Sequence, residues 1–427
     1  MRLGRGFPAH FLLGPFAGVE CYHDRMKVRR RQIGFVLGLL FIVGMSTGAF
    51  VYVHSPTLLF NAALDRIAQC LQQQKDAVIC TEPIVRALLM TNSGADIMDA
   101  LAKRFPEFQC HYVGHVVGQQ LYAKYKSTEL AISSCNSVCE SACTHGIIGE
   151  AFAEALGADD TGNLDLDHLT ADDIRVVGRK LCTSAQTCHG VGHGLFQWYG
   201  DIAPSLSECG DIASRSIAPF CYSGVFMEYT DVLTSRNVRP VDGVTYPDPE
   251  NLKDFCTGQP TIEETRACFL FFPRIVITDL EVHGFSYDHA FERLQAMCQA
   301  YPPGDMRSAC FSGLGSYYTY LQVENLPLAH SACEMYSKLA DQAACNFGEI
   351  TIDASDRQSS VFPYCRGLAT DQLKETCYQG IFSKLNLMGV SVTDSATAYC
   401  KSDPVCLNAA SLYRTDPWEE IRTVFGA

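Results

Sequence analysis

The chain has 427 residues, of which 47% are hydrophobic, and a formal net charge of −14. Its length is enough for one large domain or two to three ordinary ones, and its apolar content excludes bulk disorder. The charge is unevenly spread, because residues 1–32 carry a net +5 and the residues after Val53 carry a net −19. A domain this acidic has no basic surface to neutralise phosphates, so we expect no nucleic-acid partner.

The N-terminal part predicts a membrane anchor. Residues 33–53 are an uncharged run of 21 residues, long enough to cross a bilayer as a helix. A basic cluster directly precedes this run, at Arg25, Lys27, Arg29, Arg30 and Arg31. Positive charge stays on the cytoplasmic side, so we expect a cytoplasmic basic segment over 1–32 and a single signal-anchor helix over 33–53. A cleaved signal peptide is the alternative, disfavoured by the length of the run, and Met26 is an alternative start.

The cysteines place the rest of the chain in an oxidising compartment. Cys21 precedes the apolar run, and the other 20 of the 21 cysteines follow it. An even number of cysteines in an exported domain is what ten disulfides require. We therefore predict an extracytoplasmic domain, periplasmic or lumenal. The absence of an N-x-S/T sequon favours the periplasm.

The exported part contains a cysteine repeat. Five pairs share one spacing of twelve, namely Cys209/Cys221, Cys256/Cys268, Cys298/Cys310, Cys333/Cys345 and Cys365/Cys377. The second cysteine commonly opens a glycine-containing phrase, such as CYSGVF at Cys221 and CYQGIF at Cys377. The second cysteines of successive pairs lie about 32 to 47 residues apart, which is the range of two-helix repeats.

Each repeat predicts a helical hairpin closed by its disulfide. Residues 288–299 have apolar residues at helical spacing, residues 301–305 (YPPGD) interrupt the pattern, and residues 306–321 resume it. Shorter pairs are expected at Cys182/Cys188 and Cys400/Cys406. Fifteen pairings remain open for the other six cysteines, which are Cys70, Cys80, Cys110, Cys135, Cys139 and Cys143.

The predicted fold class is all-α: one transmembrane helix followed by a disulfide-stapled α/α helical-hairpin repeat domain of solenoid type. In chain order, the parts of the exported region are a leading helical segment at 54–109, histidine- and glutamate-bearing repeats at 110–233, a Pro/Asp-rich insertion loop at 234–255 and further stapled repeats at 256–427.

One cluster of residues carries the functional prediction. When the repeats are aligned on their second cysteine, the positions one, five and seven residues later are apolar or aromatic in most repeats. In the first four repeats they hold two histidine pairs, each four residues apart, and two glutamates. With one further histidine, the candidate metal ligands are His111, His115, His145, His189 and His193, and the candidate catalytic residues are Glu150 and Glu228.

Histidines four residues apart project from one helix face, and imidazoles facing carboxylates on adjacent helices build metal sites in helical proteins. We expect zinc, iron, copper or manganese, which ligand type alone does not separate. A hydrogen-bonded polar network and a bis-histidine haem site are the alternatives. The later repeats are expected to lack such a pocket.

Two functions from different classes follow from these observations. The first is a metal-dependent enzyme of unknown substrate, in which Glu150 and Glu228 are ligands or general acid/base groups. The second is a membrane-tethered repeat scaffold that binds a protein or peptide partner on a concave face. No nucleophile-elbow, P-loop, H-E-x-x-H or C-x-x-C motif is present to favour another chemistry.

Overall fold

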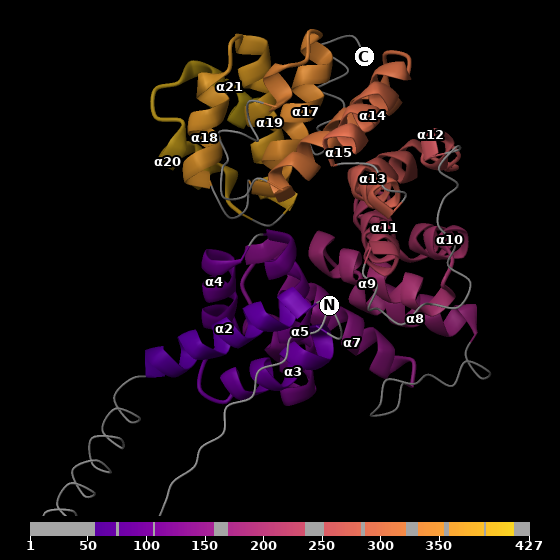
Figure 1. The fold of residues 1–427 in the computed structure, drawn as a ribbon, viewed down its shortest axis with the longest axis vertical. Coiled ribbons are helices and arrows are strands. Elements are labelled where there is room, and N and C mark those ends of the chain that lie inside the picture. Colours follow the sequence, from indigo (N-terminus) through magenta and orange to yellow (C-terminus); the bar gives the residue numbers. More distant parts are fainter. Residues whose placement is uncertain are drawn as a thin grey trace, which may run out of the picture. The chain divides into compact units, whose positions relative to one another are not determined.

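The computed structural model describes residues 56–73, 77–105, 107–157, 170–234, 252–282, 287–321, 332–353, 358–387 and 390–413. In these residues it is all-helical, with nineteen helices (Figure 1). No helix there is long and apolar enough to cross a bilayer. The predicted anchor at 33–53 and residues 235–251 of the predicted insertion loop lie outside the described residues, so both stay predictions. Residues 63–427 form one unit by backbone contacts, separate from residues 1–62.

Nine helices, here called the core helices, each pack against the next one along the chain. The core helices are α5 (Glu107–Tyr125), α7 (Val138–Ala155), α9 (Ala185–Tyr199), α11 (Ala218–Thr234), α13 (Ile262–Val282), α15 (Asp305–Leu321), α17 (Leu339–Asp353), α19 (Asp371–Leu387) and α21 (Pro404–Leu412). Their facing sides hold the largest buried side chains, including Phe196, Phe226 and Phe272.

Shorter flanking helices alternate with the core helices in the chain, and most of them contact two consecutive core helices. They are α4 (Gly94–Arg104), α6 (Thr128–Ser133), α8 (Ala171–Leu181), α10 (Ile202–Ile212), α12 (Leu252–Phe255), α14 (Tyr287–Ala300), α18 (Gln358–Gly367) and α20 (Val392–Tyr399), preceded by α2 (Pro56–Gln73) and α3 (Ala77–Leu88). This alternation confirms the predicted order of helical hairpins.

All five twelve-spaced cysteine pairs form disulfides. Cys209 on α10 is bonded to Cys221 on α11, so the bond joins a flanking helix to the core helix that follows it. The shorter pairs Cys182/Cys188 and Cys400/Cys406 are also bonded as predicted. The pairing left open by the sequence is Cys70–Cys80, Cys110–Cys139 and Cys135–Cys143.

The recurring glycine brings core helices into backbone contact. A Cβ added at Gly315 on α15 would lie 1.9 Å from the carbonyl oxygen of Cys345 on α17. A Cβ added at Gly348 on α17 would lie 1.8 Å from the carbonyl oxygen of Ser312 on α15. Any side chain at either position would force the helices apart, so glycine is required there for the observed approach.

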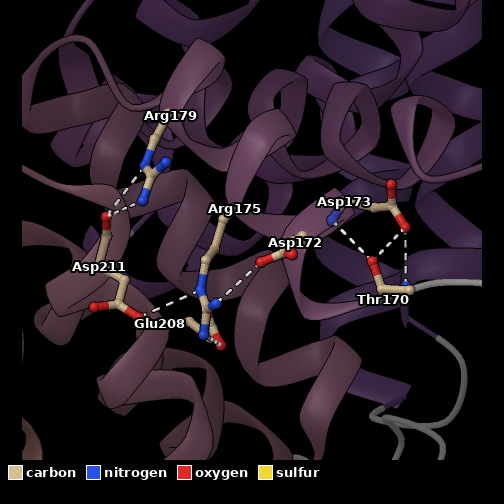
Figure 2. Close-up of polar contacts among 7 residues, drawn as sticks. All are labelled: Thr170, Asp172, Asp173, Arg175, Arg179, Glu208 and Asp211. Atoms are coloured by element: carbon tan, nitrogen blue, oxygen red, sulfur yellow. Dashed lines mark hydrogen bonds and ion pairs between the residues drawn. The ribbon is translucent and has the colours of Figure 1, made fainter.

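Polar contacts fix the flanking helices (Figure 2). Thr170 and Asp173 form a capping box at the start of α8. Further along α8, Arg175 donates two hydrogen bonds to the carboxylate of Glu208 on α10, at 2.7 and 2.8 Å. Because Glu208 is buried, this bidentate ion pair fixes the packing of α8 against α10.

Candidate metal centre

Three consecutive core helices bring the five predicted histidines together. Helix α5 carries His111 and His115, α7 carries His145, and α9 carries His189 and His193. Since α5 packs on α7 and α7 packs on α9, repeat-equivalent positions become spatial neighbours. The five imidazole rings lie in contact, with centroids of neighbouring rings 4.4 to 5.9 Å apart.

Four of these rings have the spacing of a metal-binding set. One ring nitrogen from each of four histidines lies within 4.8 Å of the other three, in a group made of His111, His115, His145 and His193. The Nε2 atoms of His111 and His115 are 3.0 Å apart. Two nitrogens bound tetrahedrally to zinc at about 2.0–2.1 Å would be about 3.3 Å apart. The His111–His115 pair is slightly closer than this, whereas nitrogens of the group that lie up to 4.8 Å apart would have to approach one another to hold one ion.

His111 is oriented by the backbone at the start of α7. Its Nδ1 lies 3.0 Å from the carbonyl oxygen of Cys139, which can only accept, so Nδ1 carries the proton. Cys139, Glu140 and Ser141 are left-handed, with φ of 53°, 52° and 60°. Left-handed residues other than glycine are unfavourable, so the surrounding structure must hold this turn. Disulfides at Cys139 and at nearby Cys143 do so.

His193 is oriented by a carboxylate. Its Nδ1 lies 2.7 Å from Oε2 of Glu228 on α11, and both side chains are buried. Gln197 donates a hydrogen bond of 2.9 Å to the other oxygen of Glu228. A carboxylate that accepts from Nδ1 leaves Nε2 with its lone pair, and this Nε2 is buried with no hydrogen-bond partner among the described residues.

His189 contacts Ser223 and Met227, which both lie on α11. Its Nδ1 lies 2.8 Å from the hydroxyl of Ser223, and its Nε2 lies 3.4 Å from Sδ of Met227. The Ser223 hydroxyl also lies 2.8 Å from the Phe220 carbonyl oxygen, which can only accept its proton. The hydroxyl oxygen therefore accepts from Nδ1 of His189, and Nε2 of His189 turns a lone pair toward the sulfur.

Three of the imidazoles have a lowered pKa, which favours their neutral form. Burial lowers the pKa of His115, His145 and His189 well below the ordinary histidine value, and the neighbouring imidazoles lower it further. Neutral imidazole is the form that binds metals, because the lone pair is available. His115 is half-buried, whereas the other four rings are buried.

Glycines set the distance between the histidine-bearing helices. A Cβ on Gly146 of α7 would lie 2.1 Å from the carbonyl oxygen of His115. A Cβ on Gly224 of α11 would lie 2.0 Å from the carbonyl oxygen of His189. Both glycines thus face the backbone of a histidine in the cluster. Because these glycines let the helices approach closely, they also set the distances between the imidazole rings.

The two predicted glutamates have different surroundings. Glu228 contacts the cluster through His193, whereas Glu150 is half-buried, and the charges that act on it are those of Lys126, Glu154 and Glu82. Burial raises the pKa of the Glu150 carboxyl. The structure thus brings Glu228 to the histidines, whereas the charges that act on Glu150 belong to residues outside the cluster. A catalytic role for either glutamate stays a prediction.

The later repeats bury polar side chains too. Asn346 and Glu349 on α17 are buried, and the hydroxyl of Tyr364 donates a 2.7 Å hydrogen bond to Oδ1 of Asn346. A carboxylate oxygen of Glu349 lies within 4.8 Å of the sulfur atoms of Cys333 and Cys345, but those cysteines are bonded to each other and have no thiolate to bind a metal. Glu349 lies four residues after Cys345, a position outside the three that the repeat alignment compared.

Three contributors to the cluster were missed from the sequence. Met227 and Ser223 lie on α11 between the cysteine and Glu228, and the Cys139 carbonyl is a backbone group. A signal for Met227 existed, because the matching position in the two preceding repeats is glycine, at Gly149 and Gly194. No sequence pattern indicated the contact of the Cys139 carbonyl with His111, because that contact depends on the left-handed turn.

No protein-family model matches this chain. Neither a curated protein nor a solved structure is significantly similar to it. The chemistry of the site rests on its own residues.

Proposed function

We propose that the disulfide-rich domain binds a transition-metal ion through the imidazoles of four histidines. The observation that carries this proposal is the buried group of nitrogens from His111, His115, His145 and His193, all within 4.8 Å of one another. Imidazole nitrogen suits zinc, copper, iron and manganese, and four such ligands suit a tetrahedral ion.

The hydrogen bonds around the cluster support a metal over a closed polar network. In a satisfied network each buried nitrogen has a partner. Nδ1 of His145 and Nε2 of His193 have none among the described residues. Leaving such atoms unpaired costs about 1–3 kcal/mol each. An ion at the centre of the group would satisfy both.

The outer contacts have the pattern that supports metal ligands. Metal-bound histidines commonly donate their second nitrogen to a carboxylate or a carbonyl, which fixes the ring and raises its basicity. His193 donates to Glu228, and His111 donates to the Cys139 carbonyl. We assign Glu228 as a positioning residue for His193, acting on the metal through that ring.

The packing of the rings favours a single ion over haem. A bis-histidine haem requires a macrocycle between its two axial rings. Here each histidine ring is within 6 Å of its neighbours, measured between centroids, and the largest of these separations is 5.9 Å. A macrocycle would have to displace rings that already contact one another.

The partial exposure of His115 determines where a bound ion could open a coordination position for catalysis. A catalytic metal needs an open position for water or substrate, whereas four imidazoles complete a tetrahedron. Among the four ligands, only His115 is half-buried and the others are buried. Binding and retention of the ion is therefore the function that we propose, and a metal-dependent reaction would require exchange at the His115 position.

The location follows from two kinds of observation. Ten disulfides indicate an oxidising, extracytoplasmic compartment. The apolar run at 33–53 and the basic residues before it support a single membrane anchor with a cytoplasmic N-terminus. In this proposal the metal site lies outside the cytoplasm, on a periplasmic face.

The test is metal analysis of the full-length protein with its disulfides intact, followed by competition titrations with zinc and copper. Wild type should bind one ion, and a His115→Ala/His193→Ala variant should bind at least about 100-fold more weakly, because two of four ligands are lost. His289→Ala, on α14 in a later repeat, is the matched control and should bind as wild type does.

A wild-type protein that neither carries nor takes up metal would overturn the proposal. If the double alanine variant unfolds, His145→Gln replaces one ligand with a polar side chain of similar size, and normal metal binding by that folded variant would also contradict the site. The histidines would then have a structural role in the core, and binding of a protein or peptide partner by a repeat scaffold would become the better-supported function.

A further inference from the structure

We infer that this centre is built for copper, and that its cuprous form is held by a separate sulfur-containing subsite made of His189, Met227 and His145. This inference rests on the proposed metal-binding function and names the ion. It uses His189 and Met227, neither of which belongs to the four-histidine group.

The first step is the pair formed by His189 and Met227. Nε2 of His189 lies 3.4 Å from Sδ of Met227, and both side chains are more than nine-tenths buried. Since Nδ1 of His189 donates to Ser223, Nε2 bears a lone pair, and a thioether sulfur has no proton to give it. Two electron-pair donors therefore face each other, with no hydrogen between them, in a site that excludes water.

The second step is the geometry of that pair. A nitrogen at about 2.0 Å and a sulfur at about 2.3 Å from one ion, at a tetrahedral angle, are about 3.5 Å apart. The observed 3.4 Å matches this separation. A packing contact alone does not require the sulfur to meet the lone pair of the ring nitrogen, because methionine has many ways to fill a gap.

The third ligand comes from the adjoining ring. The centroid of His145 lies 4.4 Å from that of His189, the shortest separation in the cluster. Its Nδ1 is buried without a hydrogen-bond partner among the described residues. His145 thus stands between the four-histidine group, to which it also belongs, and the sulfur-containing pair.

The chemistry of the donors selects the ion. Thioether sulfur is a soft ligand that favours Cu(I), and imidazole binds copper in both oxidation states. Zinc gains little from a thioether, and manganese prefers oxygen ligands. The twenty cysteines after the apolar run are bonded in pairs, so no thiolate competes for the ion. Cu(I) would thus rest on the subsite, and Cu(II) or zinc on the four imidazoles.

The experiment measures Cu(I) and zinc affinity on the same oxidised full-length protein. Cu(I) is supplied anaerobically with ascorbate and titrated against a chromogenic Cu(I) chelator, and Ag(I) serves as a redox-inert substitute. Met227→Leu should weaken Cu(I) and Ag(I) binding at least tenfold and leave zinc affinity within twofold of wild type. Met98→Leu is the matched control, because Met98 is a buried methionine on α4, and it should change neither affinity.

X-ray absorption at the copper edge supplies the second measurement. Wild-type protein loaded with Cu(I) should show a sulfur scatterer that Met227→Leu lacks. Unchanged Cu(I) affinity in Met227→Leu, or only nitrogen scatterers in wild type, would overturn the copper inference while leaving metal binding intact. Equal weakening of zinc and Cu(I) would also overturn it, because the methionine would then be packing. A wild type that binds neither ion would instead remove the proposed function.

Discussion

Helices α5 to α11 and helices α13 to α19 are built on one plan but filled differently. Both sets have a cysteine near the start of each core helix and pack each core helix on the next. In α5, α7 and α9 the positions after the cysteine hold imidazoles, whereas in α13, α15 and α19 they hold the buried aromatic rings of Phe269, Phe311 and Tyr378. The fold therefore depends on cysteine, glycine and apolar positions that both sets share, and the histidines are an addition to it.

The second set also shows what a polar interior looks like when no metal ligands are present. Buried Asn346 accepts a hydrogen bond from Tyr364 through Oδ1, but its Nδ2 and Oε1 of Gln379 are buried without a partner among the described residues. In the histidine cluster, two buried ring nitrogens likewise have no partner among the described residues. Both interiors therefore leave buried polar atoms unpaired, and they differ in the kind of atom: amide groups in the second set and imidazole nitrogens, which can bind a metal ion, in the first.

The largest effect should come from reduction of the disulfides, which both sets need. Each twelve-residue staple contributes on the order of 3 kcal/mol in the chain-entropy model, and a typical domain has only about 5–15 kcal/mol of stability. Treatment with a strong reductant should therefore abolish the helical circular dichroism signal of both sets. Persistence of a cooperative thermal transition after full reduction would show that core packing alone suffices.

A large local effect is expected in the second set from its buried ion pair. Arg307 on α15 donates to both carboxylate oxygens of Asp341, at 2.7 and 2.5 Å. Arg307→Met would leave Asp341 buried and uncompensated, so the free energy of unfolding should fall by about 3–5 kcal/mol.

Denaturant titration checks this value, with Lys374→Met as the control. Lys374 pairs with Asp371 at 3.2 Å on the surface of α19, and its loss should change stability by less than about 0.5 kcal/mol. Equal effects of the two substitutions would show that the buried pair has no special role in joining repeats. The metal affinity should be unchanged in both variants.

Acid should destabilise the first set of helices and leave the stability of the second set unchanged. The folded protein lowers the pKa of His115, His145 and His189, so between the ordinary value of about 6.5 and the lowered values the unfolded chain binds more protons than the folded one. The stabilisation is complete above pH 6.5 and is lost as the pH falls below it, by about 1.4 kcal/mol per pH unit for each histidine.

Hydrogen exchange on the metal-free protein at pH 7.5 and pH 5.5 measures this effect by region. Amides of α5, α7 and α9 should lose protection at the lower pH, whereas those of α15, α17 and α19 should keep it. Because these pKa values are lowered, bound metal should survive to a pH below 6.5 before protons displace it. Uniform loss of protection in all helices would contradict a local origin.

The smallest effect concerns the two glutamates at equivalent repeat positions. Glu228→Gln removes the charged acceptor of His193 and should weaken metal binding about 10- to 100-fold. Glu150→Gln is the matched control, since the charges that act on Glu150 lie outside the cluster, and it should leave metal affinity within about twofold. Equal effects would mean that the carboxylates act through long-range charge and not through His193.

The sequence predicted the periodic features of this molecule and missed those that depend on irregular backbone. Twelve-residue cysteine spacing sufficed to pair Cys209 with Cys221, because both ends of one hairpin are close in the chain. The link of Cys110 to Cys139 spans 29 residues and requires the left-handed turn, which no periodicity signals.

The same limit applies to the candidate site. Alignment on the cysteines was enough to predict that the histidines of neighbouring repeats converge, since equivalent positions of packed helices meet. It treated Glu150 and Glu228 as equivalent, yet only Glu228 faces a histidine, because the two helices present that position to different neighbours. Hydrogen-bond partners are set by side-chain direction, which repeat position alone does not give.

The glycines that face the histidine backbone have an evolutionary consequence. Gly146 opposes the carbonyl of His115, and Gly224 opposes that of His189, with no room for a methyl group at either place. A mutation to alanine at these positions would widen the helix spacing and move the rings of the cluster apart. In related chains, glycine at these two positions should therefore be inherited together with the histidines. Lineages that have lost the histidines should keep these glycines too, because Gly315 and Gly348 make comparable backbone contacts in repeats without histidines.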